Sequence, residues 1–136
     1  MAKVRDFMTA EIVTVSVHSD LADAARLMRD SDVGVLPVMD GDKVRGVITD
    51  RDIVIRGLAD QKATASVGEI MKDGLISLSP DDDEHHAVSL MSEHNVRRLP
   101  VMENGRLVGM VSVGDIAVRA SEKSAGKVME KTGPQE

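Results

Sequence analysis

The chain contains one stretch of sequence twice, at a constant offset of 63 residues. Placing residues 4–57 over residues 67–120 aligns 54 positions without a gap, and 16 of them are identical. The best matches are Leu36-Pro37-Val38-Met39 with Leu99-Pro100-Val101-Met102, and Gly46-Val47-Ile48-Thr49 with Gly109-Met110-Val111-Ser112. Two similar units on one chain usually bury a shared face, so we expect a site at their joint to occur in near-symmetric pairs.

The length of the chain makes the pair of repeats the folding unit. A chain of 136 residues is long enough for one compact domain, whereas each repeat alone is near the lower limit for burying its own core. We therefore predict a first repeat with the start of a linker over residues 1–62, a second repeat over residues 63–122, and a flexible C-terminal tail over residues 123–136.

Composition excludes several classes of function. With 17 basic and 23 acidic residues the chain has a net charge of −6, which argues against sequence-independent binding of nucleic acid. The absence of cysteine excludes disulfides and thiolate metal sites and indicates a reducing compartment. No apolar stretch approaches membrane-spanning length or resembles a signal peptide. We expect a cytoplasmic, soluble protein without nucleic-acid or membrane partners.

Hydrophobic periodicity gives each repeat the order β-α-β-β-α, which is an α+β fold. The first helix is predicted from Leu21, Ala24, Ala25 and Met28, which recur at helical spacing, and its counterpart from the stripe at residues 87–91. Strands are expected at residues 12–15, 33–39 and 44–49, and again at residues 75–78, 96–102 and 107–112. Short helical turns are expected at residues 4–8 and 67–71, and a last helix near Asp50 or Gly114.

Turn and proline positions add detail to this order. Asn104-Gly105 predicts a tight hairpin turn because both residues accept positive φ, and the sequence Asp40-Gly41-Asp42 predicts a turn of the same purpose. Pro37 and Pro100 lie inside apolar runs, so we expect their strand at a sheet edge or at a bulge.

A hydroxyl-x-x-carboxylate motif follows the last strand of each repeat, as Thr49 with Asp52 and as Ser112 with Asp115. It matches a helix capping box, in which the hydroxyl and the acid each bond a backbone N–H. A helix start also offers free backbone N–H groups to an anion, and a carboxylate can accept bonds from a ribose diol. The cap and the ligand site are compatible, and Arg51 lies inside the first motif.

These motifs, the duplicated unit and the Leu-Pro-Val strand together resemble a tandem pair of CBS domains, or Bateman module, over about residues 4–119. The resemblance implies two repeats packed sheet to sheet with pseudo-twofold symmetry. It also implies two clefts that in many members bind adenosine compounds such as AMP, ADP, ATP, NAD(H) or S-adenosylmethionine. Such a ligand is regulatory, and no cofactor is required.

The resemblance implies two sets of ligand-binding residues. One cleft takes its polar contacts and one wall from the second repeat and its remaining walls from the first, as Ser112, Asp115, Arg98, Met110, Val13, Val33 and Val35. The other cleft uses Thr49, Asp52, Val47, Ile76, Val96, Arg51 and Arg97. Arg97 and Arg98 are adjacent in a strand and point to opposite faces, so at most one faces a given cleft. Because Val35 is the counterpart of Arg98, the clefts differ, and we rank the Ser112 cleft higher.

Three functions remain open from the sequence. The leading one is a non-catalytic sensor that binds an adenosyl ligand and signals to a separate effector protein or through its assembly. It is expected to form a homodimer through the helices at residues 50–58 and 115–121. The alternative is a ligand-independent interaction or stress-response dimer whose motifs are only caps. A third is a metal-responsive protein that uses His85, His86 or His94, although neighbouring histidines on a helix diverge by about 100 degrees.

Overall fold

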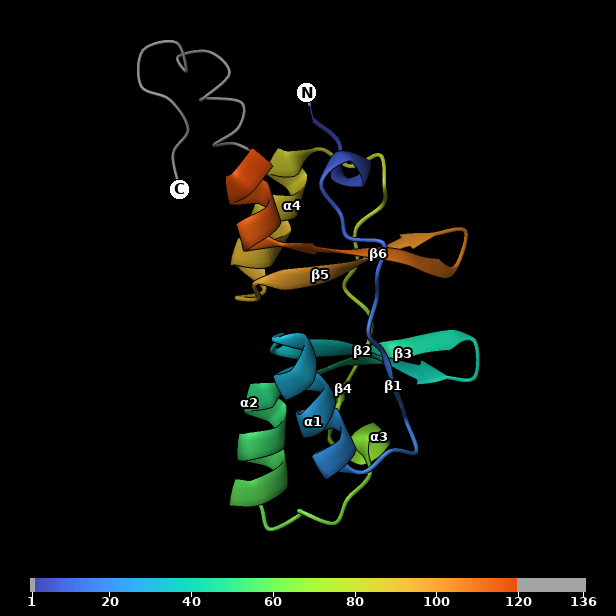
Figure 1. Ribbon diagram of the computed structural model, residues 1–136, viewed down its shortest axis with the longest axis vertical. Helices are drawn as coiled ribbons and strands as arrows, with labels where there is room; N and C mark the ends of the chain where they lie inside the picture. Colours follow the sequence, from blue (N-terminus) through green and yellow to red (C-terminus); the bar gives the residue numbers. More distant parts are fainter. Residues whose placement is uncertain (1, 120–136) are drawn as a thin grey trace. The chain divides into compact units, whose positions relative to one another are not determined.

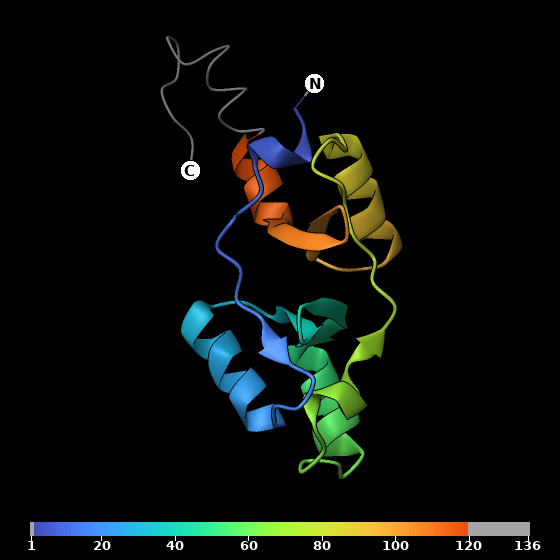
Figure 2. The ribbon, with the colours of Figure 1, turned by 90° about the vertical axis from the view of Figure 1, so that its right-hand side faces the viewer.

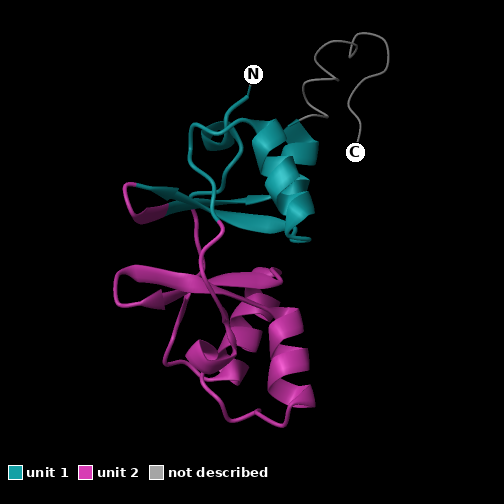
Figure 3. Cartoon of the chain, turned by 180° about the vertical axis from the view of Figure 1, so that it is seen from behind, with its two compact units in different colours: residues 1–10, 77–103, 108–136 teal, residues 11–76, 104–107 magenta. Residues whose placement is uncertain are grey.

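The computed structural model describes residues 2–119, and the chain divides into two compact units (Figure 3). The described parts of unit 1 are residues 2–10, 77–103 and 108–119, and unit 2 comprises residues 11–76 and 104–107. Both units combine strands and helices, so the predicted α+β class with two repeats is confirmed. No helix among the described residues is long and apolar enough to span a membrane.

Unit 2 is built on a four-stranded sheet of order β1-β2-β3-β4 (Figure 1). The strands are β1 Val15–Ser16, β2 Val35–Asp40, β3 Lys43–Thr49 and β4 Lys72–Asp73. Strand β1 runs parallel to β2, whereas β2–β3 and β3–β4 are antiparallel. The helices are α1 Leu21–Ser31, α2 Asp50–Asp52, which continues into the π-helical segment η2 Ile53–Ala59, and α3 Val67–Ile70.

Helix α1 shows how the sequence determines the unit 2 core. Asp20 caps its N-terminus by accepting a hydrogen bond from the backbone N–H of Asp23, and Asp32 ends the helix in the left-handed region at φ 54°. The predicted apolar face is buried at Leu21 and Met28. These side chains belong to one core cluster with the interior residues of β2 and β3. The burial of this face supplies most of the helix's stability.

Unit 1 carries the same elements from the second repeat. They are the 3-10 turn η1 Val4–Asp6, helix α4 Glu84–Glu93, strand β5 Arg98–Glu103 and strand β6 Arg106–Ser112, of which residues 108–112 belong to unit 1 and the hairpin residues 104–107 are grouped with unit 2. Residues 113–119 are helical. Leu78 bridges Val101 in the parallel sense, as Val15 pairs with Val38 in unit 2. The predicted Asn104-Gly105 turn is confirmed, with φ values of 52° and 78°.

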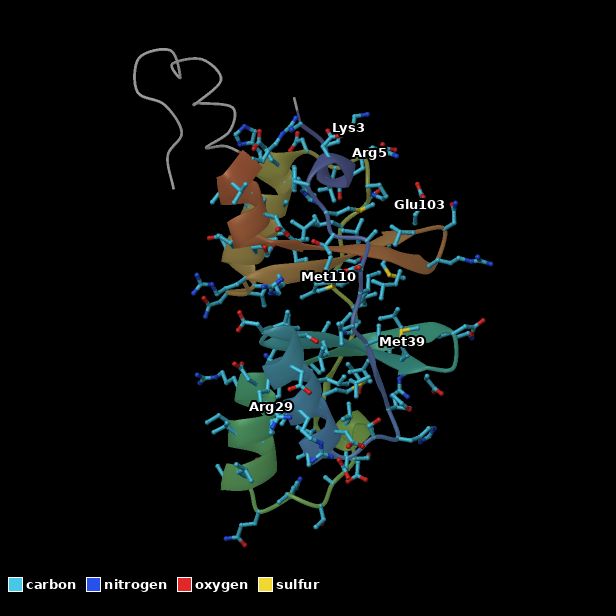
Figure 4. The ribbon with its side chains drawn as sticks, in the orientation of Figure 1. Lys3, Arg5, Arg29, Met39, Glu103 and Met110 are labelled. Atoms are coloured by element: carbon cyan, nitrogen blue, oxygen red, sulfur yellow. The ribbon has the colours of Figure 1, made fainter. Side chains whose placement is uncertain are left out.

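The N-terminal segment belongs to unit 1, although it begins the first sequence repeat. Val4 is buried in the unit 1 core, and Thr9 and Met110 exchange backbone hydrogen bonds of 2.8 and 2.9 Å. Figure 2 shows η1 beside α4. Arg5, labelled in Figure 4, pairs with Asp81, and its guanidinium lowers the pKa of that carboxyl below its usual value. The segment is therefore part of the packed unit.

The segment that opens the second sequence repeat packs in unit 2 in the same way. Helix α3 buries Val67 and Ile70 in the unit 2 core, and β4 adds a strand to its sheet. The segment that opens each sequence repeat thus packs in the unit formed mainly by the other repeat. The boundary after residue 62 and the tail from residue 123 stay sequence predictions, and the tail lies outside the described residues.

The two prolines differ in their place in the sheets, since Pro37 lies in an inner strand, whereas Pro100 lies in β5 of the two-stranded β5–β6 sheet, in which each strand is an edge. Strand β2 lies between β1 and β3, so the edge expectation for Pro37 is wrong, whereas the expected irregularity is present as a register shift between Val38 and Met39. In unit 1 the Pro100 carbonyl accepts a bond of 2.9 Å from Leu78 N–H. Since N and O of one strand residue face the same side, the missing N–H of Pro100 faces the short Leu78 segment and not β6.

Candidate functional site

The first candidate junction is the point where β3 ends and α2 begins. Thr49 Oγ1 accepts a hydrogen bond of 3.0 Å from Asp52 N–H, and Thr49 N–H donates at 2.9 Å to Asp52 Oδ2. The Asp52 residue is 3% exposed. This reciprocal pair is the predicted capping box, and it leaves Oδ1 of Asp52 outside the cap.

The second junction repeats this geometry in unit 1. Asp115 N–H donates to Ser112 Oγ at 2.9 Å, and Ser112 N–H donates to Asp115 Oδ2 at 3.0 Å. Ser112 is buried, while Asp115 is half-buried. Within residues 2–119, Asp115 Oδ1 accepts no hydrogen bond. The cap interpretation is confirmed at both junctions, and one carboxylate oxygen remains available at the second.

The expectation of free backbone N–H groups is wrong at the first junction. The N–H groups of Asp50, Arg51 and Asp52 donate to Gly34 O, Asp50 Oδ1 and Thr49 Oγ1. Short polar side chains at the helix start satisfy these groups locally. An anion at this junction therefore needs a side-chain cation.

A backbone hydrogen bond ties each junction to the start of the Leu-Pro-Val strand. Asp50 N–H donates to Gly34 O, and Val113 N–H donates to Arg97 O, both at 2.9 Å. In unit 2 this places Val35 opposite Thr49 in the β2–β3 register. In unit 1 the equivalent residue is Arg98. Arg98 is half-buried and Arg97 is exposed, and within residues 2–119 neither forms an ion pair.

The predicted apolar walls are distributed over both units. Met110, labelled on β6 in Figure 4, is buried in unit 1, and Val96 is partly buried against the unit 1 core. The remaining walls lie in unit 2, where Ile76 is exposed and the others are partly buried: Val13, Val33, Val35 and Val47. Each predicted cleft combines residues of both units, so the clefts stay a prediction. The structure describes one capped junction in each unit, and we call each junction a half-site of the predicted clefts.

Lys72 lies beside Asp52, although no sequence motif pointed to it. Its Nζ atom lies 3.9 Å from Oδ1 of Asp52, the carboxylate oxygen that the capping bond does not use. Strand β4 brings it there by pairing Lys72 with Val47 of β3. The repeat alignment places Lys72 opposite Thr9, which pairs with Met110 in unit 1. This difference between threonine and lysine at equivalent repeat positions was the sequence signal that could have pointed to Lys72.

The histidines do not gather into a metal site. Within residues 2–119, no group of three His, Cys, Asp or Glu side chains could hold a metal ion. His86 Nε2 lies 3.8 Å from Asp82 Oδ2, and His94 Nε2 lies 3.5 Å from Glu93 Oε2. His85 adds no third ligand to either pair.

Both helices that follow the junctions expose apolar side chains. On η2 the exposed residues are Val54, Ile55 and Leu58. On the helix at residues 113–119 they include Val113 and Val118, and an apolar groove of about 380 Å³ separates this helix from α4. Such surfaces are typical of faces that another protein surface covers.

Comparison with known proteins gives several close relatives. "CBS domain-containing protein YhcV" of Bacillus subtilis is 38% identical over 131 residues, which cover 95% of this chain and 94% of that protein. "Hypoxic response protein 1" of Mycobacterium tuberculosis is 42% identical over 120 residues, covering 86% and 84%. The crystal structure of Hypoxic Response Protein I with two coordinated zinc ions has a TM-score of 0.78 at 40% identity, covering 86% of this chain and 98% of that one.

Two further solved structures contain adenosine compounds. The CBS domain pair of protein MJ0100 in complex with 5-methylthioadenosine and S-adenosyl-L-methionine has a TM-score of 0.82 at 28% identity, covering 90% of this chain and 98% of that one. CBSX2 in complex with AMP has a TM-score of 0.80 at 26% identity, covering 91% and 99%. The family model for the CBS domain matches residues 4–58 and 67–122, the two copies of the repeat. The chain therefore belongs to the CBS-domain family, as a protein with two CBS domains.

Proposed function

We propose that the protein is a non-catalytic regulatory module that binds an adenine nucleotide or another adenosyl ligand. The observation that carries the proposal is the carboxylate left over by each cap, above all Asp115, whose Oδ1 accepts no bond within residues 2–119. A ribose diol supplies two adjacent hydroxyl donors for such an oxygen. The capping bond holds the carboxylate in place and so reduces the entropy lost on binding.

The relatives support the ligand class without identifying the ligand. AMP is bound to CBSX2, and 5-methylthioadenosine and S-adenosyl-L-methionine are bound to the CBS pair of MJ0100. The adenosyl group is common to all three compounds. A ligand that prefers one conformation shifts the population toward it by its difference in affinity. We propose that a separate effector protein, or the assembly state, responds to this shift.

Titration calorimetry with AMP, ADP, ATP, NADH and S-adenosylmethionine tests the proposal. At least one should bind, and Asp115→Asn should weaken it by about tenfold because the charge of the acceptor is lost. Asp6→Asn is a matched control, since Asp6 also accepts a backbone N–H, from Lys3, in the same unit. The absence of binding by all five compounds up to millimolar concentration would favour the ligand-independent alternative.

We also propose a homodimer formed through the helices at residues 50–58 and 115–121, of which residues 120 and 121 lie outside the described part. The exposed apolar residues of η2 and of the helix at residues 113–119 support this. Leu58→Glu should shift a concentration-dependent dimer toward monomer in sedimentation velocity. His18→Glu, on an exposed loop, should leave the dimer unchanged. A wild-type protein that is monomeric at every concentration contradicts the proposal.

A further inference from the structure

We propose that Lys72 is the phosphate-binding residue of the unit 2 half-site and gives that half-site a preference for phosphorylated adenosyl ligands over neutral ones. The inference rests on the proposed function. Lys72 lies outside the Thr49–Asp52 motif, on strand β4, which belongs to the second sequence repeat but pairs with β3 in unit 2.

The backbone fixes the position of Lys72. Strand β4 pairs with β3 at Gly46 and Val47, and a Cβ added at Gly46 would lie 2.2 Å from the Lys72 carbonyl oxygen. No real side chain tolerates that separation from a backbone atom, so glycine at position 46 is what allows β4 to approach. The Lys72 side chain therefore begins from a backbone that pairs with β3 beside the junction.

The Lys72 ammonium group forms an ion pair with Asp52 at the junction. The carboxylate is buried with 3% of its surface exposed, whereas the Lys72 side chain is 61% exposed, and the two groups lie 3.9 Å apart. A buried carboxylate needs a compensating charge, and Lys72 is the one cation that pairs with it among residues 2–119. The ammonium carries three donors, so it can face Asp52 and still donate to a ligand from its exposed side.

Electrostatics at this junction require such a cation for an anionic ligand. Asp50 and Asp52 flank the helix start, and the N–H groups of residues 50–52 are already bonded within the protein. A phosphate would meet two carboxylates and no free backbone donor. Arg51 is exposed and forms no ion pair within the described residues, whereas Lys72 Nζ lies 3.9 Å from the Asp52 carboxylate. Lys72 is therefore the better placed of the two cations.

The equivalent position of unit 1 carries no charge. Thr9 makes the same pairing with Met110 that Lys72 makes with Val47. Threonine can donate one hydrogen bond but cannot compensate a phosphate charge. Residue 9 and residue 72 therefore distinguish two half-sites whose capping boxes are alike.

The experiment compares AMP with adenosine, which differ by the phosphate alone. Calorimetry on the 136-residue protein is repeated with Lys72→Gln and with the control Arg45→Gln. Arg45 is a cation of the same unit that pairs with Asp40 and Asp73. Lys72→Gln should lower the affinity for AMP by about tenfold, as expected for the loss of a charge-assisted hydrogen bond. The affinity for adenosine should stay within about twofold of the wild-type value. Arg45→Gln should change neither affinity. Thr9→Lys should raise the affinity for AMP relative to that for adenosine.

The outcomes separate the inference from the function on which it rests. Suppose that the wild-type protein binds both compounds and that Lys72→Gln lowers both affinities equally. Lys72 then acts only by supporting Asp52, so the inference is overturned while the proposed function stands. An unchanged AMP affinity in Lys72→Gln also overturns it. If the wild type binds neither compound nor any other adenosyl ligand, the proposed function fails and the inference fails with it.

Discussion

The hydroxyls of Thr49 and Ser112 each accept one helix N–H that would otherwise be unsatisfied in a partly buried place. Thr49→Ala and Ser112→Ala should each lower the free energy of unfolding by about 1 kcal/mol, the usual effect of losing an N-cap. Urea denaturation followed by circular dichroism measures this. Thr49→Ser keeps the hydroxyl and should remain close to wild type. Equal losses for Thr49→Ser and Thr49→Ala would show that the methyl group and not the cap is responsible.

Gly46 tests the close approach of β4 to β3. Gly46→Ala should destabilise the protein by about 1–3 kcal/mol because the added carbon overlaps the Lys72 carbonyl and forces a backbone shift. Gly114→Ala is the control, since its added carbon meets Ser112 Oγ at 3.5 Å, an ordinary contact, in a helical segment. It should be neutral or stabilising by up to about 1 kcal/mol. A Gly46→Ala protein as stable as Gly114→Ala would contradict the account of β4.

Individual residues show what the sequence could and could not predict. The capping boxes were predictable because a cap depends on residues three positions apart. The occupied N–H group of Asp50 was not, since its acceptor is Gly34 O, which lies just before β2 and 16 positions earlier in the sequence. Lys72 was missed for a similar reason. Its neighbour Asp52 is 20 positions earlier in the sequence, and only strand pairing brings the two together.

At the scale of elements, η1 and α3 hold equivalent places in different units. Val4 and Val67 are repeat partners and both are fully buried, Val4 in unit 1 and Val67 in unit 2. Each Val→Ala substitution should lower the free energy of unfolding by about 2 kcal/mol because it removes two buried methyl groups and leaves a cavity.

The location of the damage distinguishes the two substitutions. In hydrogen exchange, Val4→Ala should lower protection in β5 and β6, while Val67→Ala should lower it in β2 and β3. Each valine contacts the core cluster of those strands. If Val4→Ala instead loosened β2 and β3, the placement of the N-terminal segment in unit 1 would be wrong.

Hydrophobic spacing predicted the helices and central strands well, because local period and local burial agree there. The α1 face and the β2–β3 hairpin follow the pattern closely. The edge position expected for Pro37 was wrong because a proline needs only its own N–H side free. The sequence alone cannot tell this condition from a true sheet edge.

At the scale of the whole molecule, sequence repeats and compact units have different boundaries. Residues 11–76 contain nearly all of unit 2, whereas residues 1–62 lack α3 and β4 and carry an N-terminal segment that packs elsewhere. A fragment of residues 11–76 should therefore show dispersed amide resonances and a cooperative melting transition. A fragment of residues 1–62, of similar length, should show neither. Cooperative folding of the shorter fragment alone would refute this assignment of segments.

The pairing of Thr9 with Met110 also has a consequence during synthesis on the ribosome. Its partner Met110 is made about a hundred residues after Thr9. At about 5–20 residues per second, the N-terminal segment waits roughly 5–20 s for its place. By contrast, the strand pairs of the unit 2 sheet need no residue after Asp73. The segment that contains Thr9 therefore completes this pairing only after β6 has been made, and until then its apolar side chains, Val4 and Phe7 among them, lack the unit 1 core that buries them in the folded protein.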